Sequence, residues 1–199
     1  MVWSFRYEPR GPRPDGRIVE GHRGLLEVVD ATPDGGVGLI GGWQGTSGRP
    51  IKPETVPKVI QFFRKRPLLD YEALFVWTVS DRLRALIEEM EPGAHQFERV
   101  EALAKNGSPL ETRWFWQICN RLDSVHSEET LWDFDGHSWR IPPRWDKKSH
   151  LIFDLSKIGK TKFWHDKHVV SASFCSNEAH DRLVAEGMTG FRYSYREQA

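Results

Sequence analysis

The stretch FVWTVSDRLRALIEEMEPGAHQF, residues 75–97, decides the fold, because its signals recur in FCSNEAHDRLVAEGMTGF, residues 174–191. In each stretch a short apolar run ends on a serine, Ser80 or Ser176, and a helical pattern follows. Serine is a preferred N-cap, since its hydroxyl accepts a backbone N–H of the first helical turn. Each helical pattern ends on a methionine and then a glycine, and another apolar run follows. The sequence therefore predicts a unit of strand, serine-capped helix and strand that occurs twice.

The N-terminal third of the chain carries weaker signals. Residues 1–24 hold three prolines and four glycines, which predicts an extended lead-in. Residues 25–29 and 37–43 are apolar runs separated by the turn residues 33–36, so we expect two strands there. Apolar side chains then recur at positions 56, 59, 60 and 63, the spacing of a helix that buries one face. We expect that helix to end before Pro67.

The C-terminal two thirds add further strands to the two units. Residues 96–103 and 112–122 are strand-like and flank an Asn106-Gly107 turn, which indicates a hairpin. Residues 151–155 predict a short strand, and residues 159–170 an irregular or extended segment. About three helices then alternate with strands, so the fold class is α+β with a mixed, mostly antiparallel sheet. We expect an N-terminal subdomain, 1–66, and an α+β domain, 67–199, or one continuous domain.

The composition limits the possible functions. Lys and Arg number 28, as do Asp and Glu, so the formal net charge is zero, and a non-specific nucleic-acid binder would need a cationic surplus. Apolar residues make up 39% of the chain, which is enough for a packed core. Cys119 and Cys175 have no metal-ligand spacing and predict buried thiols in a reducing compartment. The N-terminal residues lack the apolar region of a signal peptide, and no apolar run is long enough to span a membrane, so we expect a cytoplasmic protein.

The most pointed polar cluster is Trp164-His165-Asp166-Lys167-His168. Two imidazoles and a carboxylate could hold a zinc or manganese ion and serve a metal-dependent hydrolase. The segment is not clearly helical, however, and the glutamate of an HEXXH motif is absent. A structural or recognition loop anchored by Trp164 accounts for the same residues. We therefore expect no metal and no cofactor, and keep the hydrolase as the alternative.

Aromatic residues in a polar stretch suggest a protein interface. Residues 123–149 are polar and rich in turns, yet contain Trp132, Trp139 and Trp145, with Arg140 beside the second of these. Tryptophan and arginine are the side chains that most often dominate binding energy at interfaces. We therefore predict these four residues to be partly exposed anchors for a partner protein.

The order of short motifs along the chain resembles that of a known family. The matching elements begin at Pro67 and run to the C-terminus: Pro67-Leu68-Leu69-Asp70-Tyr71, the helix start at Val79-Ser80, Phe97, Asn120-Arg121-Leu122-Asp123, Leu151-Ile152-Phe153-Asp154, Phe163-Trp164-His165-Asp166, Phe174-Cys175-Ser176 and Gly187-Met188-Thr189-Gly190-Phe191. Together they resemble the predicted immunity proteins of bacterial polymorphic toxin systems, immunity family eleven.

This resemblance implies an α+β fold with a notable tryptophan, which we place at Trp164. It also implies a small, non-enzymatic cytoplasmic protein that is made beside a toxin and neutralises it by binding, and we expect the toxin to be a nuclease-type effector. Trp164, His165 and Asp166 thereby join the candidate partner-binding residues. No direct contact with nucleic acid or membrane is expected, and the oligomeric state stays open.

Overall fold

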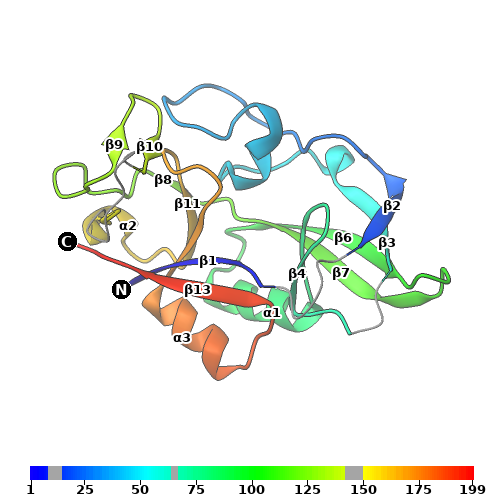
Figure 1. Cartoon of the computed structure of the whole chain (residues 1–199). Coiled ribbons are helices and arrows are strands. Elements are labelled where there is room, and N and C mark those ends of the chain that lie inside the picture. The colour runs from blue at the N-terminus through cyan, green and yellow to red at the C-terminus, as the bar shows by residue number, and fades with distance from the viewer. Residues whose placement is uncertain (9–14, 64–66, 142–149) are drawn as a thin grey trace.

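The fold is known from a computed structural model, which describes residues 1–8, 15–63, 67–141 and 150–199. These residues form the helices α1 (Asp81–Met90), α2 (Leu155–Ile158) and α3 (Asn177–Ala185), and their strands gather mainly in two mixed sheets (Figure 1). Most neighbouring strands run antiparallel, while β3–β6 and β8–β11 are parallel pairs. The predicted α+β class with a mixed, mostly antiparallel arrangement is confirmed.

The strands of each sheet come from distant parts of the chain. The larger sheet has the order β2 (Gly16–Gly21), β3 (Pro57–Phe62), β6 (Gln96–Leu103), β7 (Pro109–Gln117), β5 (Trp77–Val79) and β4 (Tyr71–Ala73). The smaller sheet has the order β13 (Phe191–Arg196), β1 (Val2–Tyr7), β12 (Ser173–Ser176), β11 (Phe163–Asp166) and β8 (Arg121–Leu122). A separate hairpin consists of β9 (Asp133–Phe134) and β10 (Trp139–Arg140).

Both predicted serine caps are present. Ser80 Oγ accepts the Leu83 N–H at 3.2 Å at the start of α1, and Ser176 Oγ accepts the Ala179 N–H at 3.2 Å at the start of α3. The two helices lie side by side, since Arg182 of α3 forms an ion pair with Glu89 of α1. Each hydroxyl therefore satisfies a backbone donor that the first turn of a helix leaves without a partner.

The two serine-capped units also share their strand pairing. Strands β5 and β6 flank β7 and run antiparallel to it, and β12 and β13 flank β1 in the same way. In each unit a helix thus connects two parallel strands that are separated by one antiparallel strand. Whether the two units superpose in space stays a prediction.

One core cluster joins the two sheets to the helices. Phe5 of β1, Trp116 of β7 and Phe163 of β11 are buried together, with the Trp116 and Phe163 rings 5.3 Å apart. Leu83 of α1 and Leu183 of α3 close the same cluster. Both sheets contain strands from either side of residue 66. The division into 1–66 and 67–199 and the alternative of one continuous domain both stay predictions.

The helix expected over residues 56–63 is wrong, because this segment forms strand β3. Its residues pair with β2 on one side and β6 on the other. Valine and isoleucine favour strands, and a proline is tolerated at the first residue of a strand, where Pro57 lies. The four apolar positions fit a helical spacing by coincidence. Backbone pairing with β2 and β6 decides the structure of this segment instead.

The N-terminal expectations also need correction. The lead-in over residues 1–24 contains β1 and β2, and β1 lies inside a sheet. The strands expected at 25–29 and 37–43 are absent from the described residues, where Val28 forms a single bridge to Ile51 and a 3₁₀ helix spans Gly41–Thr46. The Gln44 side chain accepts the Val28 N–H at 2.6 Å, so a side chain takes the place of a strand partner.

One C-terminal expectation is wrong in detail. The strand expected at 151–155 is reduced to isolated bridges at Phe153, and Leu155 already belongs to α2. The segment 159–170, expected to be irregular or extended, contains the extended strand β11. The Asn106-Gly107 turn between β6 and β7 is confirmed, since the Gly107 N–H donates to the Ala104 carbonyl. No helix in the described part of the chain is long and apolar enough to cross a membrane.

Candidate partner-binding site

The hairpin β9–β10 places large apolar side chains at the surface. Leu131, Phe134 and Ile141 lie within or directly beside it, and each is about half exposed. Trp132 and Trp139 are partly buried against a core cluster that contains Phe153 and Trp164, whereas Arg140 is exposed. Trp145 lies outside the described residues. The structure thus brings three of the four predicted anchors, Trp132, Trp139 and Arg140, into one region.

Local hydrogen bonds shape the hairpin. Asp135 Oδ1 accepts the backbone N–H groups of Ser138 at 2.7 Å and His137 at 3.0 Å, which closes the turn. These two hydrogen bonds lower the pKa of the Asp135 carboxyl and favour its charged form. Across the strands, the Phe134 and Trp139 rings lie 4.8 Å apart. Asp135 also pairs with Arg140, so the exposed residues are held by their neighbours.

His168 joins the hairpin to the smaller sheet. Its Nδ1 donates to the His137 carbonyl at 2.8 Å, and its own carbonyl accepts the Trp139 N–H at 2.9 Å. Its ring and that of Phe134 form a T-shaped contact, with the ring centres 5.1 Å apart. One histidine therefore contacts both strands of the hairpin and the turn between them.

A buried polar network holds the segment that carries His168. Asp166 accepts the His168 N–H at 2.8 Å, and its other oxygen accepts the N–H and hydroxyl of Ser124 at 2.6 and 2.8 Å. Trp164 Nε1 donates to the same Ser124 hydroxyl at 3.1 Å. Burial raises the pKa of Asp166, although the hydrogen bonds from His168 and Ser124 act in the opposite direction. The cluster singled out in the sequence therefore supports the hairpin from inside.

Burial decides the role of three candidate partner-binding residues. Trp164, His165 and Asp166 are 0%, 2% and 1% exposed, so these side chains offer no surface for direct contact with a partner. Trp164 and Asp166 are linked to the hairpin through Ser124 and His168, and Trp164 also belongs to the core cluster against which Trp132 and Trp139 pack. A role of these three residues in partner binding could therefore only be indirect.

The geometry does not support the alternative hydrolase. His165 Nδ1 donates to the Ala172 carbonyl at 2.9 Å, while His168 Nδ1 donates to the His137 carbonyl. Burial lowers the pKa of His165 to about 4, so its imidazole is neutral at physiological pH. Within residues 1–8, 15–63, 67–141 and 150–199, no three His, Cys, Asp or Glu side chains are arranged to hold a metal ion. The two histidines therefore serve backbone groups rather than a shared ion.

A second cluster, Glu91, His95 and Cys119, has the residue types of a cysteine nucleophile and its base. His95 Nε2 donates to Glu91 at 2.9 Å, but His95 Nδ1 accepts the backbone N–H of Cys119 at 3.3 Å and does not face the thiol. Burial raises the pKa of the Cys119 thiol to about 11, whereas a nucleophilic cysteine needs a lowered pKa. This cluster is structural.

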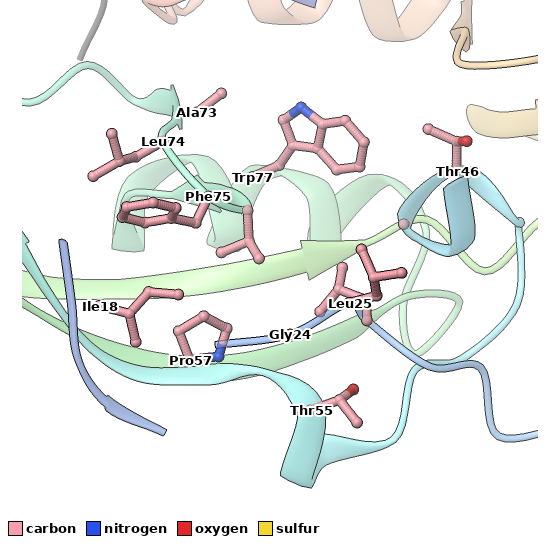
Figure 2. A pocket seen from close by; sticks show the side chains of 13 residues that line it. Ile18, Gly24, Leu25, Thr46, Thr55, Pro57, Ala73, Leu74, Phe75 and Trp77 are labelled. Atoms are coloured by element: carbon pink, nitrogen blue, oxygen red, sulfur yellow. The ribbon is translucent and has the colours of Figure 1, made fainter. Parts of the chain in front are cut away.

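The larger sheet carries an apolar pocket of about 340 Å³. Figure 2 shows Leu74, Phe75 and Trp77 on one side and Ile18, Pro57 and Leu25 facing them. The hydroxyls of Thr46 and Thr55 are among its few polar side-chain groups, and no ionisable side chain lines it. The pocket therefore lacks the acid, base or nucleophile that catalysis would need.

Sequence reasoning missed Phe134, Asp135 and the role of His168. The Asp135-Gly136 pair is a hairpin signal between strand residues and could have located β9–β10. The link between His137 and His168 spans 31 positions, and no local pattern could have revealed it.

Comparison with known proteins agrees with the resemblance noted in the sequence. The model of the immunity protein family, Imm11, matches residues 20–197, nearly the whole chain. A search of curated proteins found no match.

Proposed function

Since the chain belongs to the immunity protein family Imm11, we propose that it binds a cognate toxin and neutralises it without catalysis. The family match over residues 20–197 carries this proposal. We further propose that the toxin comes from a bacterial polymorphic toxin system and that the two proteins meet in the cytoplasm. The mechanism that we propose is occlusion, for which a stable scaffold and a binding surface are sufficient.

The hairpin β9–β10 is the surface that we propose contacts the toxin. Phe134 is exposed beside Trp139 and Arg140, and aromatic and arginine side chains are favoured as interface anchors. Asp135 accepts the Ser138 N–H and His168 donates to the His137 carbonyl, and these two hydrogen bonds hold the hairpin backbone in shape before binding. A surface that is ordered in advance loses less entropy on association.

The proposed toxin class, a nuclease-type effector, makes a specific demand on charge. A nuclease binds phosphate groups through a cationic surface, so a protein that covers this surface should present carboxylates. The hairpin carries two carboxylates, Asp133 and Asp135, and one arginine, Arg140. The net charge of the hairpin is therefore negative. Incubating the neighbouring gene's product with DNA and RNA, with and without this protein, tests the class. A toxin that degrades neither substrate would exclude a nuclease.

Co-expression with the toxin encoded beside this chain tests the proposed function. We expect growth to be rescued. The dissociation constant of the complex should be nanomolar or lower, which corresponds to a binding free energy of about −12 kcal/mol. Protection should saturate at one copy of this protein per toxin, because occlusion involves no turnover. Rescue at a small fraction of the toxin concentration would indicate an enzyme instead.

Alanine variants test the proposed surface. We expect truncation to alanine to reduce the binding free energy by more than about 2 kcal/mol at one or more of four positions, Trp132, Trp139, Arg140 and Trp145. Phe134→Ala should weaken binding as well. Leu110→Ala is the matched control, because Leu110 is also an exposed apolar residue but lies on β7. Circular dichroism checks that each variant is folded. If all five variants bind and protect like the parent chain, the interface lies elsewhere.

A further inference from the structure

Strand β13 forms an open edge of the smaller sheet. It pairs with β1 along its whole length, and the strand order places no described strand on its far side. Directly beyond its end, the Glu197 carbonyl accepts the Phe153 N–H at 3.1 Å, so the open part of the edge is Phe191–Arg196. The Glu8 N–H donates to the Gly190 carbonyl, and hydrogen-bonded pairs alternate along an antiparallel ladder. The N–H and C=O groups of Phe191, Tyr193 and Tyr195 therefore point away from β1. Such an edge is a template for a further strand.

One face of this edge carries three arginines. Arg192 and Arg196 lie on β13, and the register places Arg6 of β1 directly opposite Arg192. Directly opposed like charges destabilise a strand pair. Glu8 approaches Arg192 at 3.9 Å, while Arg196 donates its Nε–H to the neutral hydroxyl of Ser4 at 2.9 Å. Within the described part of the chain, Glu8 is the only carboxylate that pairs with any of the three.

The opposite face of the edge is aromatic. Phe191, Tyr193 and Tyr195 alternate with the arginines along β13, and the Phe191 and Tyr193 rings stack at 5.5 Å. Phe191 and Tyr193 pack against the core, but Tyr195 is 50% exposed. A strand added to this edge would therefore meet positive charge on one face and aromatic rings on the other.

We propose that the β13 edge is a docking site for an extended acidic segment of a partner protein, in which carboxylates alternate with apolar side chains. The backbone of the segment pairs with the outward groups of β13, as in other cases of strand addition. Its carboxylates lie beside Arg192 and Arg196, and its apolar side chains cover Tyr193 and Tyr195. This site is separate from the hairpin and does not depend on the toxin-binding proposal.

Charge argues against a second copy of this chain as the occupant. Two identical antiparallel strands related by a two-fold axis keep the same side chains on the same face. Two copies would therefore gather all their arginines from positions 6, 192 and 196 on one face, where like charges repel. Nucleic acid would supply negative charge, but it has no peptide groups to pair with the open edge. An acidic peptide segment satisfies both features.

Titration of the ¹⁵N-labelled full chain with the capped peptide Glu-Val-Glu-Val-Glu-Val tests the proposal. We expect chemical shift changes at the amides of Phe191, Tyr193 and Tyr195. The peptide Lys-Val-Lys-Val-Lys-Val should not bind. The acidic peptide methylated on alternate backbone nitrogens should bind at least about tenfold more weakly, because it cannot donate to the edge.

Arginine variants separate the contribution of charge from that of the backbone. Arg6→Glu combined with Arg192→Glu should weaken binding of the acidic peptide at least about tenfold. Arg99→Glu is the matched control, since the Arg99 side chain is 63% exposed and lies on β6. The affinity of this variant for the acidic peptide should stay within about twofold of that of the parent chain. Thermal unfolding checks that the double variant is folded. Arg6→Gln combined with Arg192→Gln removes both positive charges without adding negative ones and serves as a second, milder double variant.

Several results would overturn the proposal. One is the absence of binding at millimolar acidic peptide, and another is equal affinity in the parent and the double arginine variant. A chain that sediments as a dimer with protected β13 amides would assign the edge to a second copy. A single-stranded oligonucleotide that binds the same arginines more tightly than the peptide would assign this face to nucleic acid.

Discussion

Asp70 shows how one carboxylate ties distant segments together. Its oxygens accept the Ser80 hydroxyl at 2.8 Å, the Thr189 N–H at 2.9 Å and Arg82 Nη2 at 2.8 Å. Burial alone would raise the pKa of Asp70, but these hydrogen bonds outweigh burial and lower it from 3.8 to about 2. A single side chain thus connects the start of α1 to the turn before β13.

The lowered pKa of Asp70 predicts a loss of stability in acid. Its folded-state pKa lies below its unfolded-state value, so its contribution is fully present above about pH 4 and is lost as the pH falls from about 4 to about 2. The contribution amounts to about 2 kcal/mol. We expect Asp70→Asn to remove most of this pH dependence in urea unfolding measured between pH 2 and 5. The exposed Asp133→Asn should leave it unchanged, and equal curves for the parent and Asp70→Asn would contradict the assignment.

The two serine caps should contribute unequally to the free energy of unfolding. Ser80→Ala removes both the cap of α1 and the hydrogen bond to Asp70, so we expect a loss of at least about 1 kcal/mol in the free energy of unfolding. Ser176→Ala removes the cap of α3 and should cost about 0.5–1 kcal/mol. Ser80→Thr keeps a hydroxyl and should recover most of the loss. A thermal scan in which Ser80→Ala matches the parent would rule out a stabilising cap.

At the scale of elements, the support of the hairpin β9–β10 is testable apart from toxin binding. His168→Ala removes the hydrogen bond to the His137 carbonyl and the ring contact with Phe134. We expect faster amide hydrogen exchange in the hairpin, by about tenfold, while α1 and α3 keep their protection. His180→Ala is a control on α3 and should not change exchange in the hairpin. Unchanged exchange after His168→Ala would mean that the hairpin holds its shape alone.

The elements also show what the sequence could predict. Helices α1 and α3 carry a serine cap and an apolar stripe within about ten residues, so local signals were sufficient to find them. Strand β3 and strand β1 depend on partners that are distant along the chain, and their own residues fit other structures. The same limit applied to the candidate site, where aromatic residues indicated the hairpin region but the buried link from Ser124 to Asp166 and His168 did not follow from spacing.

At the scale of the whole molecule, Glu91 joins the end of helix α1 to the smaller sheet. Its carboxylate accepts the backbone N–H groups of Lys162 at 2.8 Å and Phe163 at 3.0 Å, and also bonds His95 and Asn120. Glu91 follows α1, whereas Phe163 begins β11 of the smaller sheet. The end of α1 is thereby fixed to a strand more than seventy positions away.

Substitution of Glu91 should therefore weaken the whole fold. Glu91→Gln replaces one acceptor oxygen with a donor that faces N–H groups, and we expect a loss of about 2 kcal/mol in the free energy of unfolding. Fluorescence and far-UV circular dichroism should report the same midpoint, because both sheets share one core. Glu88→Gln on the same helix is the control and should change stability by less than about 0.5 kcal/mol. A normal midpoint for Glu91→Gln would show that α1 and β11 hold together without this carboxylate.

The position of β1 affects how the protein is made. This strand is synthesised before β12 and β13, yet it lies between them in the smaller sheet. At about 5–20 residues per second, β1 waits about 10–40 s for its neighbours. During that interval its apolar residues are exposed to chaperones and to other nascent chains. The smaller sheet can therefore close only after the later strands are complete.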